Sequence, residues 1–298
     1  MPRLPGALAT LLAGSAVLAL GAVAPAQTST AALQAPAADA TTDDASTPPA
    51  VPTPAKPGVR PELPVQKHYE LANTALENGD HDTSLYHYER AVAGQPDDLK
   101  WGAEYRQVAI AAEAYDRSIE FFEALAEEHP ESAHVQMNLG YAHVDKIPAE
   151  GAITQVILAN TALTHFSNSL EIQESWLGFY TRGNSYMYWP AVFGRTPLGI
   201  ADLEKAIALA DGMEKLQFHG RAWAALGDGY WRLDQREKMR EAWQKGSEMY
   251  PGLPELEARL AKEGDELDAY LDAQFETSRR VATHLREIFG GEASEDAP

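Results

Sequence analysis

The sequence predicts an all-α fold: a solenoid of about five helical hairpins, closed by C-terminal capping helices. Small residues and aromatic rings recur at fixed intervals around each expected hairpin. Pro96 and Pro130 lie thirty-four positions apart, a length typical of one repeat made of two antiparallel helices. A hairpin of this kind leaves an apolar face exposed, so we expect consecutive copies to stack on one another.

The first 26 residues have the pattern of a secretory signal peptide. Arg3 supplies positive charge, residues 7–23 are mostly Ala, Leu, Val and Gly, and residues 24–26 place small side chains where a signal peptidase cuts. We expect cleavage before Gln27, a periplasmic location and no membrane span afterwards. The alternative is an uncleaved anchor, because the apolar run approaches the ~20 residues that span a bilayer.

Residues 27–64 are rich in Ala, Thr, Pro, Ser and Asp, and the first aromatic residue of the chain is Tyr69. Such a composition cannot build a core, so we expect a disordered linker. It serves either as an extended tether for the folded part or as a spacer without function.

The repeats occupy residues 65–252. Small residues and rings in residues 78–91 precede Pro96, and residues 114–122 repeat the pattern before Pro130. The fullest copy is residues 223–230, which is followed by Trp243 and Pro251. These Trp, Leu-Gly, Tyr and Pro positions resemble the tetratricopeptide repeat, and the resemblance implies a right-handed superhelix of stacked helix pairs.

Two further copies have lengthened hairpins. Residues 137–140 begin the third copy. Its second helix carries Ala162, Phe166 and Ser169, which lie about ten residues later than the repeat consensus places them. The fourth copy opens near Gly183 and has its second helix at residues 199–209, so residues 189–197 form a short insertion. Trp189 and Phe193 either give this insertion a binding role or fill the gap that it opens.

Residues 253–290 are expected to cap the array. One capping helix spans residues 254–263 and a second spans residues 265–289. The second carries an apolar stripe of Leu267, Leu271, Ser278, Val281, Leu285 and Ile288. Gly290 and Gly291 end it, and residues 291–298 form an acidic tail that we expect to be disordered.

In the tetratricopeptide family, the inward-facing residues of each first helix usually form the binding groove. The positions that match by register are Tyr69, Asn73, Gln107, Met137, Tyr141, Tyr180, Asn184, Met187, Asp228, Trp231 and Arg232. Rings, amides and thioethers suit an extended peptide or a partner helix. The alternative for any one of these residues is a core or stacking contact.

Some relatives clamp a C-terminal carboxylate with Lys and Asn. Asn73 and Asn184 match the Asn positions, but Tyr69 and Tyr180 replace the Lys, so this clamp is not expected. Arg182 and Arg195 are the candidate contacts for an anion or carboxylate.

Composition and motifs argue against nucleic-acid binding and catalysis. The formal net charge is −20, which opposes binding to phosphate backbones, and there is no cysteine. The histidines are scattered through different repeats, no HExxH or phosphate loop occurs, and the Gly227–Gly229 pair fits helix packing. We therefore expect no enzyme activity, no cofactor and no metal site.

The sequence favours an exported scaffold or adaptor that binds a partner protein, as a monomer or weak oligomer. The alternative is an accessory or maturation factor for a periplasmic enzyme that binds a metal or small ligand, which would require histidines to cluster in the fold. A catalytic function ranks third, because it would need a deep pocket with paired carboxylates.

Overall fold

The computed structural model describes residues 63–276 and 281–289. The chain divides into two units, residues 1–50 and residues 51–298, and every described residue lies in the second. The expected signal peptide, nearly all of the expected linker and the acidic tail lie outside the described residues. None of the helices described is both long and apolar enough to cross a bilayer.

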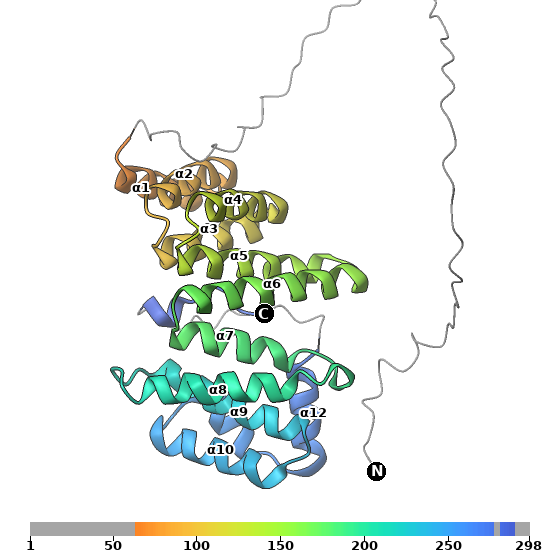
Figure 1. Cartoon of the computed structure of the whole chain (residues 1–298). Coiled ribbons are helices and arrows are strands. Elements are labelled where there is room, and N and C mark those ends of the chain that lie inside the picture. The colour runs from red at the N-terminus through yellow and green to blue at the C-terminus, as the bar shows by residue number, and fades with distance from the viewer. Residues whose placement is uncertain (1–62, 277–280, 290–298) are drawn as a thin grey trace, which may run out of the picture. The chain divides into compact units, whose positions relative to one another are not determined.

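Five helical hairpins follow one another along the described chain, and these residues contain no strand (Figure 1). The hairpins are α1 (Val65–Glu77) with α2 (His81–Gly94), α3 (Leu99–Ala111) with α4 (Tyr115–Glu128), α5 (Ala133–Lys146) with α6 (Ala152–Ile172), α7 (Trp176–Met187) with α8 (Thr196–Ala210), and α9 (Arg221–Arg232) with α10 (Arg236–Met249). Each second helix packs on the next first helix, and α3 contacts α5 as α7 contacts α9. The all-α solenoid of five hairpins is confirmed.

The remaining elements are short. They are η1 (Ile147–Ala149), η2 (Ala191–Phe193), η3 (Gln217–Gly220), α11 (Pro254–Leu260), α12 (Gly264–Gln274) and η4 (Arg286–Phe289).

Side-chain caps begin several of the hairpin helices. The Asp80 carboxylate accepts from the Thr83 backbone N–H at 3.1 Å, and Asp98 does the same for α3. Ser132 and Ser175 cap α5 and α7 through their hydroxyl oxygens. These side chains satisfy donors that a helix start leaves unpaired, so they fix where each helix begins.

Glycine allows the closest contact in the fifth hairpin. A Cβ at Gly227 would lie 2.1 Å from Nε1 of Trp243, whose side chain is completely buried. The same indole nitrogen donates to the Ala224 carbonyl at 3.0 Å. Gly229 faces Met187 in the same way. The two glycines are packing residues, as their position in the repeat predicted.

The insertion between α7 and α8 lies at residues 188–195. α8 begins at Thr196, three residues before the predicted Gly199, because Pro197 fits the first turn of a helix, where no backbone donor is needed. Trp189 is buried and fills the gap, whereas the Phe193 side chain is 54% exposed. Only one of the two rings therefore has the filling role.

The prediction of one capping helix over residues 265–289 is wrong. α12 ends at Gln274, and residues 281–285 are not helical. Leu267 and Leu271 pack in a cluster with Trp243, whereas Leu285 packs in a different cluster with Met137. The apolar stripe is therefore buried against two separate parts of the fold, the last hairpin and the helices α3 and α5. One straight helix could not contact both.

Candidate functional site

The described residues near the C-terminus lie against α3 and α5. We call residues 281–289 the tail segment, drawn in dark blue in Figure 1. We call the residues of α3 and α5 that surround it the tail site: Arg106, Gln107, Met137, Tyr141 and Asp145. Three of these five, Gln107, Met137 and Tyr141, are predicted groove residues, and the structure brings them together. The expectation that this part of the groove is open is wrong, because the chain itself covers it.

A buried guanidinium forms the polar part of the tail site. The Arg106 side chain is completely buried, and its Nη2 donates to the Thr283 carbonyl oxygen at 2.9 Å. Its Nη1 donates to Asp145 Oδ2 at 2.8 Å, and its Nε donates to Asn138 Oδ1 at 3.1 Å. The Thr283 hydroxyl in turn donates to Asp145 Oδ1, and Gln107 Nε2 lies 3.5 Å from the same hydroxyl oxygen. Both the backbone and the side chain of Thr283 are therefore recognised.

Helix packing positions this guanidinium. A Cβ at Gly102 would lie 2.2 Å from Asn138 Nδ2, so the glycine of α3 leaves the space that the amide of α5 occupies. The amide oxygen then orients Arg106, and the guanidinium lies over the Tyr141 ring at 4.7 Å. The site is thus assembled by the close approach of two first helices.

The apolar part of the tail site receives Leu285. This side chain is 9% exposed and belongs to a cluster with Ala103, Met137, Tyr141, Ala162 and Phe166. Leu285 has φ +55°, in the left-handed region that costs a residue with a side chain about 1–3 kcal/mol. Burial of the leucine offsets this strain.

A cavity of about 190 Å³ continues from the tail site, with Ile288 of the tail segment in its wall. Its other apolar walls are Leu99, Ala133, Met137, Trp176, Leu177, Met213 and Phe218. His219 also lines it, is 1% exposed, and has no hydrogen-bond partner for either ring nitrogen within the described part of the chain. The tail segment therefore leaves space beside Ile288 unfilled.

Tyr141 is a predicted groove residue that the site encloses. Its hydroxyl lies 2.6 Å from Thr181 Oγ1 of α7, and its ring packs edge-on against Phe166. Burial raises the pKa of Tyr141 to about 12, so its hydroxyl is neutral at physiological pH. Tyr141 thus joins two repeats and contributes an uncharged wall to the tail site.

Tyr69 and Asn73 of α1 make intramolecular contacts within and beside the first hairpin. The Tyr69 ring stacks on Trp101 at 4.7 Å. Asn73 accepts a hydrogen bond from the Tyr88 hydroxyl at 2.7 Å and donates to the Tyr69 carbonyl. Both side chains are half-buried, so they retain an accessible part while they stabilise the first hairpin.

Of the three groove residues predicted on α7, Met187 is a core residue. It is completely buried, and its thioether faces Gly199 of α8 and Gly229 of α9. Its assignment to the groove is wrong, because the close approach of three helices encloses it. Tyr180 stacks on Trp176 at 4.8 Å and is half-buried, as is Asn184.

Asp228 is likewise an internal residue. It is 3% exposed and forms a two-pronged ion pair with Arg259 of α11, with distances of 2.6 and 2.7 Å. This pair joins the last hairpin to its cap. The prediction that Asp228 lines the groove is wrong, since its carboxylate is enclosed with a charged partner.

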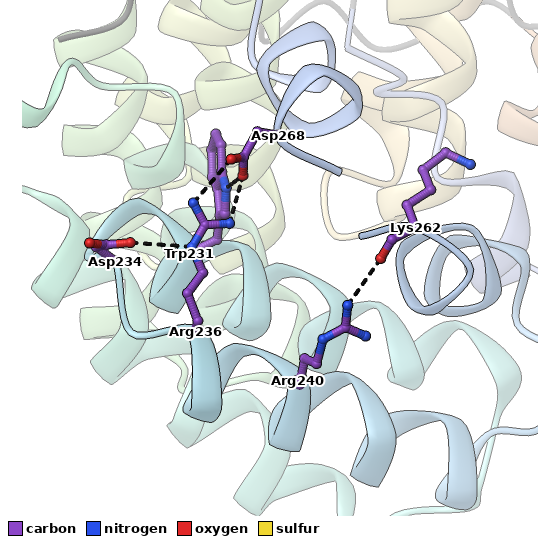
Figure 2. Close-up of polar contacts among 6 residues, drawn as sticks. All are labelled: Trp231, Asp234, Arg236, Arg240, Lys262 and Asp268. Atoms are coloured by element: carbon purple, nitrogen blue, oxygen red, sulfur yellow. Dashed lines mark hydrogen bonds and ion pairs between the residues drawn. The ribbon is translucent and has the colours of Figure 1, made fainter. Parts of the chain in front are cut away.

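The capping helix α12 covers the predicted groove residue Trp231. The indole nitrogen donates to Asp268 at 2.7 Å, and Arg236 donates to the same carboxylate at 2.6 Å (Figure 2). Figure 2 also shows Arg240 donating to the Lys262 carbonyl, a second link between α10 and the capping region. Trp231 is half-buried, so α12 covers part of its side chain, and its place in the groove stays a prediction.

Arg232 is covered as well. Its Nη2 donates to the Trp189 carbonyl at 2.8 Å, and its guanidinium lies over the Phe275 ring at 5.0 Å. Burial lowers the pKa of Arg232. This residue ties the insertion to the end of α12.

The two candidate anion contacts have intramolecular partners. Arg182 donates to both Asp202 oxygens at 2.7 and 2.8 Å, and also to Ser167. Arg195 lies over the Trp189 ring at 3.6 Å and donates to Asn160. Arg182 is committed to a carboxylate of its own chain, which disfavours binding of an external anion.

Packing of the two helices within a hairpin brings four of the histidines together as two pairs, one in the first hairpin and one in the third. His68 Nδ1 lies 2.8 Å from His87 Nδ1, and the rings of His143 and His165 stack at 5.4 Å. Among residues 63–276 and 281–289, no three or more His, Asp or Glu side chains form a group that could hold a metal ion. The geometry gives no specific support to the metal-binding alternative.

The sequence did not identify Arg106, Asp145 or the tail segment as parts of the site. Arg106 adjoins the predicted Gln107, and Asp145 lies one helical turn beyond Tyr141, so the repeat register pointed to the right surface. Thr283 contacts Arg106 across 177 positions of sequence. No local pattern reports a contact at that separation.

Comparison with known families agrees with this architecture over part of the chain. Residues 75–141 match the family model of the tetratricopeptide repeat. A thermophilic tetratricopeptide-repeat protein of Thermus thermophilus is similar to the chain, with 20% identity and a TM-score of 0.48 over 66% of this chain and 97% of that one.

Two structures of the protein MamA are also similar, each with 16% identity. Their TM-scores are 0.44, over 62% of this chain and 91% of that one, and 0.43, over 65% and 98%. No curated protein gives a significant match. Residues 75–141 thus carry the tetratricopeptide-repeat signature, and they lie in an array of five helical hairpins, a fold typical of protein-interaction scaffolds.

Proposed function

We propose that this protein is a non-catalytic scaffold that binds an extended segment of a partner protein at the tail site. The observation that carries the proposal is the hydrogen bond from the buried Arg106 to the Thr283 backbone carbonyl. A buried donor without an acceptor is costly, so any segment that covers this site has to present an acceptor such as a backbone carbonyl to Arg106. The tail segment supplies that backbone within the chain, and a partner segment would supply it in a complex.

The chemistry of the site supports binding rather than turnover. The Asp145 carboxylate is buried, paired with Arg106 and hydrogen-bonded to a hydroxyl. These contacts fix a bound segment in position. The other walls are apolar and aromatic, which gives contact area at little cost in ordering.

We also propose that the scaffold acts in the periplasm after export. The support is the signal-like pattern of residues 1–26, together with the net charge of −20, which favours basic or neutral partners. The intact mass of the protein purified from its host tests this proposal. A mature chain that begins at Gln27 is expected, and a full-length cytosolic chain would contradict it.

Site-specific photo-crosslinking tests the binding function. A photoreactive residue at Gln107 is expected to capture a partner, and mass spectrometry is expected to map the adduct to an extended segment of it. The matched control carries the same residue at Glu120, which is exposed on α4 outside the tail site. Capture at both positions, or adducts only with the chain's own tail segment, would rule out a partner site here.

A further inference from the structure

We infer that the tail segment is an internal competitor, and that its side chains give the pattern of the partner peptide. The pattern is Ser or Thr, then any residue, then Leu, then a bulky apolar residue three positions further on. This inference rests on the proposed function, because it describes what the same site selects.

The hydroxyl position is Thr283. Its side chain is buried, and its O–H donates to a buried carboxylate that already accepts from Arg106. Valine has the same shape but no donor, so it would leave the Asp145 oxygen without this hydrogen bond. Serine keeps the donor. A hydroxyl is therefore selected chemically, and not by size alone.

Exposure alternates over residues 282–286, so one side of this part of the tail segment is buried against the site. Thr283 and Leu285 are buried, whereas Ala282 and Arg286 are exposed and His284 is half-buried. The side chains at the buried positions contact the site and determine which peptides it binds. His284 between these positions accepts from the Arg286 backbone N–H, a contact within the tail segment itself, so the pattern leaves this position open.

The bulky position corresponds to Ile288. The cavity beside it is unfilled and lined mostly by apolar side chains, including Trp176 and Phe218. An aromatic ring at this position can fill space that isoleucine leaves empty, and would add dispersion and apolar burial. A partner peptide with Phe here would bind more tightly than the tail sequence.

Two properties make the tail segment displaceable. Leu285 carries a left-handed backbone angle, a strain that a partner with a different local sequence avoids. Covalent attachment keeps the tail segment near the site at an effective concentration of roughly 1 mM. A partner segment therefore displaces the tail only if its concentration or its affinity for the site is high enough. The tail segment therefore sets a threshold for binding.

The test uses the full chain and a fluorescein-labelled peptide of residues 281–289, Val-Ala-Thr-His-Leu-Arg-Glu-Ile-Phe. The chain variant Thr283→Val with Leu285→Ala weakens its own tail and is expected to bind the peptide at least about tenfold more tightly than the unmodified chain, as measured by anisotropy. Circular dichroism checks that the variant keeps its helices, and Thr283→Val alone serves if the double variant does not.

Changes in the peptide test the pattern itself. The Thr283→Val form of the peptide is expected to bind about tenfold more weakly, the Leu285→Ala form more weakly still, and the Ile288→Phe form several-fold more tightly. Equal affinity for all forms would overturn the pattern while leaving photo-crosslinking at Gln107 to decide the proposed function. No binding by a folded variant chain would overturn the inference that the tail is a competitor.

Discussion

Replacing Arg106 by Met is expected to lower the free energy of unfolding by about 3–5 kcal/mol. The guanidinium is completely buried and bonds to Asp145, Asn138 and the Thr283 carbonyl. Its removal leaves a buried carboxylate without its ion-pair partner, and also removes the donor that holds the tail segment. Urea unfolding followed by circular dichroism measures the change.

A matched control separates this buried pair from a surface pair. Arg236 donates to Asp268 at 2.6 Å, but its side chain is 45% exposed, so Arg236→Met is expected to cost less than about 1 kcal/mol. Adding Asp145→Leu to Arg106→Met is expected to recover part of the loss, because the unpaired charge is then gone. Equal costs for Arg106→Met and Arg236→Met would contradict the assigned role of Arg106.

Stability is expected to fall as the pH is lowered from about 6.5 towards 4. Burial lowers the pKa of His143 to about 4 and lowers the pKa values of His68, His87, His165 and His219. In the fold these histidines bind protons less readily than in the unfolded chain, so unfolding takes up protons below the unfolded pKa, and stability is lost as the pH falls through this window. His143 alone contributes roughly 2–3 kcal/mol.

The matched variant is His143→Leu. Neither ring nitrogen of His143 has a hydrogen-bond partner among the described residues, so leucine sacrifices no such bond. At pH 5 the thermal unfolding midpoint of the variant is expected to equal or exceed that of the wild type. At pH 8 the two midpoints are expected to differ little. Acidification also reduces the charge of −20, which acts in the opposite direction. Parallel pH curves for the two proteins would show that His143 has no part in the acid response.

The hairpins could be predicted because the residues that define the repeat also make its contacts. Gly227 and Trp243 were assigned to the repeat from their spacing. They are in contact, and the space between them is too small for any side chain at position 227. The helix boundaries follow from caps and Pro positions that are local in sequence. Met187 was misplaced because repeat register gives the face of an isolated helix, whereas the close packing of α7, α8 and α9 determines what is enclosed.

The tail segment could not be predicted from its stripe. Leu267, Leu271 and Leu285 fit one helical period, and all three are indeed buried. A period indicates which residues are buried, but it does not indicate which surface covers them. The burial of Leu285 beside Met137 depends on a chain path that joins distant repeats, and no local propensity encodes that path.

Intramolecular crosslinking tests most directly the claim that the tail segment occupies the site. The chain has no cysteine, so Gln107→Cys with Ala282→Cys introduces the only two thiols and leaves Thr283 in place, since Ala282 is exposed. A short bismaleimide is expected to join them rapidly within one chain, and far faster than it joins the control pair Glu120→Cys with Ala282→Cys. Equal rates for the two pairs would show that the tail segment does not lie at the tail site.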